Sequence, residues 1–224
     1  MQTRSFSSTL QVTDHPVAVS VEPAVTHRNR LTCAFRPILA LPHILLVGGP
    51  VAFALSIAVP GDGKSGFEWG GGGVLGAVAV VCAIIAWFAI VFGFPAPSGL
   101  ENLVTLYVRW RVRAVAYLAL LRDEYPPFGE GDYPATLRLP PAEAPRDRVT
   151  VAFRLLLALP HLVAIWVLGV AWAITTIIAW FSILFTGNYP RSLYRFATGV
   201  LQWNTRVEAY VLLLRDQYPP FSLD

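Results

Sequence analysis

Charged residues are scarce in this chain, and lysine is almost absent. Only 14% of its 224 residues are Asp, Glu, Lys or Arg, whereas about a quarter are charged in an ordinary soluble domain. Lys64 is the single lysine among 17 basic residues. Hydrophobic residues make up 55% of the chain, and its mean hydropathy is +0.54. This composition argues for a membrane protein.

Signatures of catalysis, metal binding and secretion are also missing. The two cysteines, Cys33 and Cys82, form neither a disulfide framework nor a metal knuckle. There is no GxSxG, no HExxH and no Walker loop. The first hydrophobic run follows 36 mostly polar residues, so we expect no cleavable signal peptide. We therefore expect no enzyme activity, no cofactor, no metal and no nucleic-acid partner.

What the chain does contain is one sequence unit used twice. RLTCAFRPILALPH at 30–43 matches RVTVAFRLLLALPH at 148–161, with 10 identities in 14 positions and an offset of 118. IIAWFAI at 84–90 matches IIAWFSI at 177–183, and YLALLRDEYPPF at 117–128 matches YVLLLRDQYPPF at 210–221, both at an offset of 93. The offset falls by 25, which predicts an insertion in the first copy.

Long hydrophobic runs predict membrane spans in both copies. Residues 37–59 and 74–94 contain no Asp, Glu, Lys or Arg, and each is long enough to cross a hydrocarbon core, which takes about 20 residues. Residues 155–186 form a run that would make a helix of about 48 Å, too long for one untilted crossing. We interpret this run as a hairpin that turns at Leu168-Gly169, with Trp166 and Trp172 in the interfacial aromatic belt.

The remaining segments complete each predicted repeat. Proline-bounded alternating segments, PVAVSVEP from Pro16 and PATLRLPP from Pro134, each predict a short strand before the hairpin. The fold class is thus an all-α integral membrane protein with two repeated helical hairpins, each followed by a cytoplasmic amphipathic helix lying in the interface. The predicted organisation is a flexible tail at 1–15, a first repeat at 16–128 with spans at 37–59 and 74–94 and an amphipathic helix at 98–122, a linker at 129–133, and a second repeat at 134–221 with spans at 154–168 and 171–186 and an amphipathic helix at 192–215.

Arginine placement predicts the orientation in the membrane. If both hairpins enter from one side, all the arginines lie on that side and only Lys64 lies opposite. Because positively charged loops stay cytoplasmic, we predict a multi-pass protein of the cell membrane with both termini in the cytoplasm. Had residues 155–186 formed one long span, arginines would flank both of its ends and the asymmetry would be lost.

The two amphipathic helices carry the candidate interface. Arginines and tryptophans recur on them at helical spacing, as in helices that lie at a membrane surface. The alternative, two further spans, would place several arginines at mid-bilayer at high cost. The candidate lipid or partner contacts are Arg109, Trp110, Arg113, Arg195, Trp203 and Arg206.

Each Leu-Pro-His string places a histidine inside a predicted span. Pro42 and Pro160 should kink their helices. His43 and His161 could form a metal or proton site, but neither has another ligand at helical spacing. We favour a structural role, in which each histidine bonds a backbone carbonyl freed by the adjacent proline.

Acidic residues recur beside the Tyr-Pro-Pro-Phe strings at the ends of the predicted amphipathic helices. Asp123 and Asp216 follow arginines there and can pair with them or with another arginine. Asp123 and Glu124 could instead bind a cation, an alternative that Gln217 in the second copy weakens.

The recurring strings resemble a known family. FR-LLALPH, AWF-ILF, a Tyr-Pro turn and LLRDEYPPF are similar, in that order, to the membrane family called domain of unknown function 4389, often found in tandem copies. The resemblance covers about residues 16–221, and it implies the architecture but no activity.

These features favour a non-catalytic membrane module, a scaffold or accessory subunit that docks a partner protein or anionic lipid at the cytoplasmic interface. The alternative is a transporter or channel for ions or small solutes. Because four short spans cannot enclose a path, that alternative requires a homo-oligomer.

Overall fold

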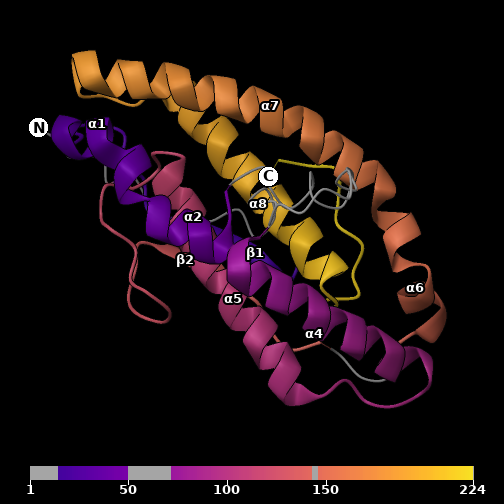
Figure 1. Ribbon diagram of the computed structural model, residues 1–224. Helices are drawn as coiled ribbons and strands as arrows, with labels where there is room; N and C mark the ends of the chain where they lie inside the picture. Colours follow the sequence, from indigo (N-terminus) through magenta and orange to yellow (C-terminus); the bar gives the residue numbers. More distant parts are fainter. Residues whose placement is uncertain (1–14, 50–71, 143–145, 224) are drawn as a thin grey trace, which may run out of the picture.

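The computed structural model describes residues 15–49, 72–142 and 146–223, and it is mostly helical (Figure 1). The described helices are α1 (Arg30–Leu39), α2 (Leu41–Val47), α4 (Gly73–Val91), α5 (Ser98–Leu118), α6 (Arg148–Ala152), α7 (Arg154–Thr186) and α8 (Arg191–Val211). The described strands are β1 (Ala18–Val21) and β2 (Ala135–Arg138). The mainly helical class is therefore confirmed.

The predicted hairpin at residues 155–186 is wrong, because α7 is one continuous helix of 33 residues. The predicted turn at Leu168-Gly169 lies within it. Its sequence explains the continuity. Between Leu162 and Thr186 the chain contains no Pro, Asn or Asp to end a helix, and a single interior Gly costs only about 1 kcal/mol relative to Ala.

The first copy contains the same long helix in an interrupted form. By the two offsets, Val47 at the end of α2 corresponds to Ile165, and Gly73 at the start of α4 corresponds to Trp166. The insertion at 48–72 therefore falls between positions that are adjacent in α7. A Cβ atom on Gly73 would lie 2.5 Å from the carbonyl carbon of Leu46, so α4 begins against the end of α2. The predicted span at 37–59 continues into residues 50–59, which lie outside the described residues.

We call α1, α2 and α4 the first rod, and α6 and α7 the second rod. The two rods run in opposite directions (Figure 1). They meet at both ends, where α1 contacts α7 and α6 contacts α4. A tryptophan at each end fixes this contact. Trp87 of α4 donates from Nε1 to the Val151 carbonyl oxygen, and Trp180 of α7 donates to that of Cys33, each at 2.9 Å.

The two Leu-Pro-His prolines behave differently from each other. The first rod bends by 44° between α1 and α2, and Pro42 occupies the first turn of α2, where a missing backbone N–H costs nothing. Pro160 lies inside α7 without ending it. The helix break of the second rod lies earlier, at Phe153 between α6 and α7.

Helices α5 and α8 form an inner layer beneath the rods. Helix α5 packs on α4, α8 packs on α7, and the two inner helices contact each other. The strands then cover these helices, β2 against α5 and β1 against α8. They pair antiparallel, with Ala18 opposite Arg138 and Val21 opposite Ala135. The two strands predicted from the proline-bounded segments are therefore present, and their pairing joins the two copies.

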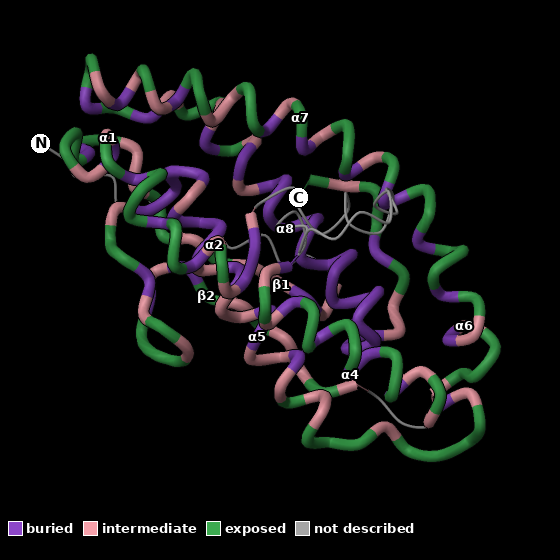
Figure 2. The backbone as a smooth tube through the Cα atoms, in the orientation of Figure 1, coloured by how far each residue is buried: buried purple, intermediate pink, exposed green. Residues whose placement is uncertain are grey.

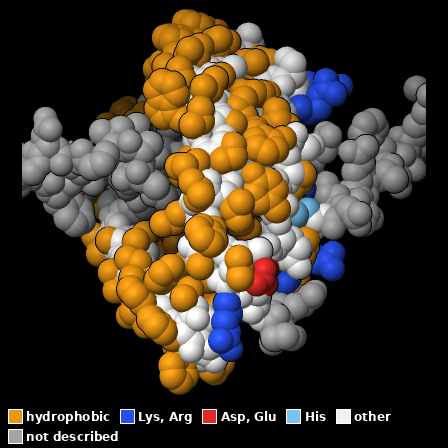
Figure 3. All heavy atoms as spheres, turned by 90° about the vertical axis from the view of Figure 1, so that its right-hand side faces the viewer, with side chains coloured by type: hydrophobic (Ala, Val, Ile, Leu, Met, Phe, Trp, Pro, Cys, Tyr) orange, Lys and Arg blue, Asp and Glu red, His pale blue; other side chains and the backbone are white. Residues whose placement is uncertain are grey.

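Burial separates the layers clearly (Figure 2). Every residue of α8 from Gly199 to Val211 is buried, so this helix does not lie open on a surface as the amphipathic prediction required. Large hydrophobic side chains are exposed along both rods instead, such as Ile84 at 51% and Val163 at 65%. Figure 3 shows hydrophobic side chains gathered on the side of the molecule where α6 and the adjoining part of α7 lie.

Length and composition make membrane association physically reasonable. Among the described residues, α4 and α7 are each long and apolar enough to cross a bilayer, and α1 with α2 would add a third such segment if counted as one bent span. The structure is thus compatible with a membrane protein.

Candidate functional site: paired aromatic cages and a polar groove

The first Leu-Pro-His string meets the first Tyr-Pro-Pro-Phe string in an aromatic cage. His43 is fully buried on α2. Trp110 of α5 donates from Nε1 to His43 Nδ1 at 3.1 Å. Phe128 stacks on the imidazole with ring centroids 4.6 Å apart, and Tyr125 lies at 4.9 Å. The histidine therefore fastens the first rod to α5 and to the segment that follows α5.

The second copy repeats this cage with the equivalent residues. Trp203 of α8 donates from Nε1 to His161 Nδ1 at 3.3 Å. Phe221 stacks on His161 with centroids 3.9 Å apart, and Tyr218 lies at 4.7 Å. The strings recur in sequence because each copy builds the same cage.

This geometry corrects the hydrogen-bond partner that we predicted for the histidines. Nδ1 accepts a hydrogen bond from an indole, so the ring proton lies on Nε2. Neither Nε2 makes a hydrogen bond to a carbonyl freed by the neighbouring proline. Within the described parts of the chain, no three His, Cys, Asp or Glu side chains come together in a way that could hold a metal ion.

A buried arginine lies beside each cage and caps the C-terminal end of an inner helix. Arg36 donates from Nη1 to the carbonyl oxygens of Tyr117 at 3.0 Å and Arg122 at 2.6 Å, and from Nη2 to Asp123 at 2.6 Å. Leu120 adopts a φ of 63° where α5 stops. A cation is favourable here because the last carbonyls of a helix carry partial negative charge. Arg154 caps α8 in the same way, through the carbonyl oxygens of Tyr210 and Arg215 and the carboxylate of Asp216.

The recurring aspartates are the counter-ions of these arginines. Asp123 accepts from Arg28 at 2.7 Å and from Arg36 at 2.6 Å. Burial alone would raise the pKa of Asp123, but the hydrogen bonds and charge of Arg28, with the further hydrogen bond from Arg36, lower it to about 2. Asp216 makes the corresponding pairs with Arg146 and Arg154, and these lower its pKa against the effect of burial. Asp123 therefore pairs with Arg28 and Arg36, and Glu124 pairs with Arg122.

One buried ion pair between the copies has no counterpart elsewhere in the repeat. Arg111 of α5 donates from Nε to Glu208 of α8 at 3.0 Å, and both side chains are 2% exposed. The Tyr107 hydroxyl donates to the same carboxylate at 3.0 Å. Burial would lower the pKa of Arg111, yet Glu208 raises it. At the positions related by the offset of 93, Asn204 and Val115 carry no charge. Because neither residue recurs in the other copy, the repeat gives no signal of this pair in the sequence.

The six predicted interface residues divide into two groups. Trp203 is 7% exposed and Arg206 is 1% exposed, so neither can contact a lipid or partner in this structure. Trp110 is bound to His43. Burial of Trp203 and Arg206 corrects their predicted role at an open surface, whereas Trp110 is half-buried.

The arginines Arg109, Arg113 and Arg195 remain accessible. The Arg109 side chain is 41% exposed and lies 3.8 Å from Glu130, a contact that contributes little at a surface. Arg113 is half-buried and donates to the Gly129 carbonyl oxygen at 3.0 Å. Arg195 is exposed near the start of α8.

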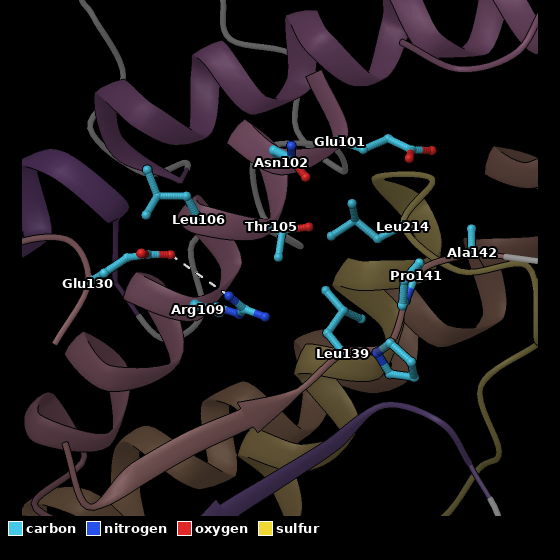
Figure 4. A pocket seen from close by; sticks show the side chains of 11 residues that line it. Glu101, Asn102, Thr105, Leu106, Arg109, Glu130, Leu139, Pro141, Ala142 and Leu214 are labelled. Atoms are coloured by element: carbon cyan, nitrogen blue, oxygen red, sulfur yellow. Dashed lines mark ion pairs between the residues drawn. The ribbon is translucent and has the colours of Figure 1, made fainter. Parts of the chain in front are cut away.

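A polar groove surrounds Arg109 (Figure 4). One part, of about 330 Å³, lies between α5 and the segments that follow β2 and α8, with Glu101, Asn102 and Thr105 along its α5 side. An adjoining part, of about 360 Å³, shares Arg109 and Glu130 and extends to Arg113 and Thr136. The groove thus presents both signs of charge, with Arg109 at its centre.

The fold and this site define a class of protein: a tandem-repeat, mainly helical protein with two helices apolar and long enough to span a membrane, in which the recurring strings form the contacts between its elements. The family model described as "Domain of unknown function (DUF4389)" matches residues 72–129 and 148–222. The chain belongs to this family, as the resemblance of its motifs implied. The first match begins at residue 72, beside the start of α4, whereas the second includes all of α6 and α7. No curated protein and no solved structure matches the chain.

Proposed function

We propose that the protein is a non-catalytic membrane module, a scaffold or accessory subunit that docks a partner protein or anionic lipid on its cytoplasmic side. Both termini lie on that side in this proposal. The observation that carries it is the division of the molecule into an apolar outer surface on the rods and a polar groove on α5. The apolar surface of the rods suits contact with lipid, and the polar groove suits a polar ligand.

The buried polar residues support a structural rather than a chemical use of the recurring motifs. Histidines, arginines and aspartates that could do chemistry are engaged with one another or with helix carbonyls. Arg109 is different, because its only ion pair among the described residues is the 3.8 Å contact with an exposed Glu130. A ligand can therefore replace that contact at little cost.

Reversing the charge of Arg109 tests the docking function. Arg109→Glu should weaken binding on the order of tenfold, because a basic residue near an anionic surface contributes roughly 1 kcal/mol and the reversal adds repulsion. Two assays separate the ligands. Purified protein in neutral nanodiscs is mixed with vesicles containing anionic or only neutral lipid, and a photo-crosslinker at Asn102 in the groove is activated in native membranes.

Arg138→Glu is the matched control, since Arg138 is exposed on β2 and does not line the groove. Loss of vesicle binding in Arg109→Glu alone would identify lipid as the ligand, and loss of a crosslinked adduct of defined mass would identify a protein. Unchanged behaviour of Arg109→Glu in both assays would refute docking at this groove.

One observation favours the alternative, transport by an oligomer. Transporters often bind their substrates between repeats, and Glu208 and Arg111 form a buried charged pair at the contact between the two copies. Transport would also require the multi-pass arrangement. Ion or solute flux through reconstituted protein that is abolished by Glu208→Gln in a folded variant would support it over docking.

A further inference from the structure

We propose that the protein does not cross the bilayer but lies in the plane of the membrane, with both rods embedded in the cytoplasmic leaflet and the strand pair facing the cytoplasm. The partner surface is thus a single lipid leaflet. This inference rests on membrane residence, which is part of the proposed function, and is independent of docking at the groove.

The exposed stripe of α7 runs the whole length of the helix. A helix of 33 residues is about 50 Å long, whereas the hydrocarbon core is about 30 Å thick. Leu155 at the start is 58% exposed, and Phe185 at the end is 77% exposed. An upright helix would place one or both of these side chains in water. A helix lying in the plane keeps the entire stripe at one depth in the lipid.

The inner layer makes a crossing costly. Because α5 packs along α4 and contacts β2, rods that crossed the membrane would place the middle of α5 near mid-bilayer. Arg109 lies at that point, and its side chain is 41% exposed. An arginine facing lipid at this depth costs at least about 2.5 kcal/mol. With the rods in the plane, the same residue lies on the cytoplasmic side of the molecule.

The strand pair leads to the same conclusion. β1 and β2 pair only with each other among the described strands. The outer side of β1 is partly closed by α8, where Gln202 accepts from the Val19 N–H, so the open edge is that of β2. Open sheet edges do not occur in contact with hydrocarbon, because their backbone groups would lose their hydrogen bonds to water. The sheet packs on α5 and α8, and the rods pack on the same two helices. With the rods in the lipid, the sheet therefore lies in water.

Basic residues at both rod ends agree with this placement. Arg30 begins α1 and Arg191 begins α8, next to the end of α7, whereas Arg148 begins α6 at the opposite end of the second rod. Arginine-rich flanks remain in the cytoplasm. A crossing rod would carry one of these groups to the outer side, and a rod in the plane keeps both groups in the cytoplasm.

Cysteine labelling at the two rod ends tests the proposal. Ser98→Cys lies at the α4 end and Ser192→Cys at the α7 end; both residues are exposed and the substitutions are conservative. They are made in full-length protein with Cys33 and Cys82, both buried, changed to Ala. We expect a membrane-impermeant maleimide to label both sites, together with Thr136→Cys on β2, in inside-out vesicles and none of them in intact cells. Labelling of the two ends from opposite sides, or of either from outside, overturns the proposal.

Depth measurements provide a second test that does not depend on sidedness. Nitroxide labels at Leu155, Trp166 and Phe185, all exposed on α7, should show equal ratios of oxygen to nickel-complex accessibility if α7 lies in the plane. A crossing α7 would instead show a depth maximum at Trp166, and that profile overturns the proposal even if docking at the groove is demonstrated. Equal depths with no docking would leave the in-plane placement standing while refuting the docking function.

Discussion

At the residue scale, the side chains that recur in both copies form the contacts that hold neighbouring elements together. His43 illustrates this, since its imidazole is held by an indole and by two aromatic rings from a different segment. An isolated histidine in a hydrophobic run suggests chemistry, and the structure supplies a packing reason for it instead. The same reasoning applies to Arg36, whose guanidinium also lies 4.4 Å above the Tyr117 ring.

The first residue-scale prediction concerns the acceptor that His43 provides. His43→Leu should destabilise the protein by about 1 kcal/mol, because it leaves the N–H of the half-buried Trp110 indole without its acceptor. His43→Gln retains an acceptor and should cost clearly less. The measurement is the loss of the monodisperse size-exclusion peak as each variant is heated in detergent. Equal stability of His43→Leu and wild type would show that the indole bond contributes nothing.

The second residue-scale prediction is a dependence of stability on pH. The pKa of Asp123 is lowered to about 2 in the folded state, from an ordinary value near 3.9 in the unfolded chain. Asp123 therefore binds a proton less readily in the folded state than in the unfolded chain. The stability that its ion pairs contribute is complete above the unfolded pKa and is lost as the pH falls through about 2.

Unfolding measured from pH 6 down to pH 2 should thus show a loss below about pH 4 in wild type. Asp123→Asn should be less stable at pH 6 and should lack that part of the pH dependence. Asp132→Asn, which alters an exposed aspartate in the same region, serves as the control. A pH profile of Asp123→Asn that parallels wild type would contradict this account.

At the element scale, the most informative comparison is between the interrupted first rod and the continuous α7. Val47 and Gly73 correspond to adjacent residues of α7, which implies that the insertion can be removed without changing the helical phase. Deleting residues 48–72 should therefore join α2 to α4 and leave a folded, monodisperse protein.

Deleting two further residues, 48–74, provides the control. At 3.6 residues per turn, the extra deletion rotates α4 by about 200° relative to α2, so the buried face around Ala79 and Ala86 would turn outward. We expect this variant to aggregate or to unfold at a much lower temperature. Similar behaviour of the two deletions in size-exclusion chromatography would argue against the helical equivalence.

At the scale of the whole molecule, two copies are combined into layers rather than placed side by side. Each rod end is fixed to the other copy by Trp87 or Trp180, and the strands pair across the copies. Neither copy has a complete core alone, because contacts between the copies occur in all three layers. The buried Arg111 and Glu208 pair adds one asymmetric contact at the centre, where loss of a single partner is expected to be strongly destabilising.

The sequence by itself determined the repeat, the helical class, the two short strands and the family, because these depend on local pattern and on strings that recur at fixed offsets. It also indicated the aspartate and arginine pairing, since charges at equivalent positions recur with the helix ends. The predicted hairpin failed because hydropathy reports how much apolar sequence is present and cannot report whether a helix bends back. The local signal that decided this point is the lack of any Pro, Asn or Asp between Leu162 and Thr186, which leaves α7 continuous.

Only the tertiary structure decided which polar residues are accessible. Arg113 and Arg206 are equivalent positions at the offset of 93, yet Arg113 lines the groove, whereas Arg206 is buried and its Nε donates to the Val17 carbonyl oxygen just before β1. The physical reason is that burial depends on contacts between segments almost two hundred residues apart in sequence. Likewise, only the folded molecule brings Arg111 to Glu208, because a pair that joins two helices from different copies leaves no periodic signal in either one.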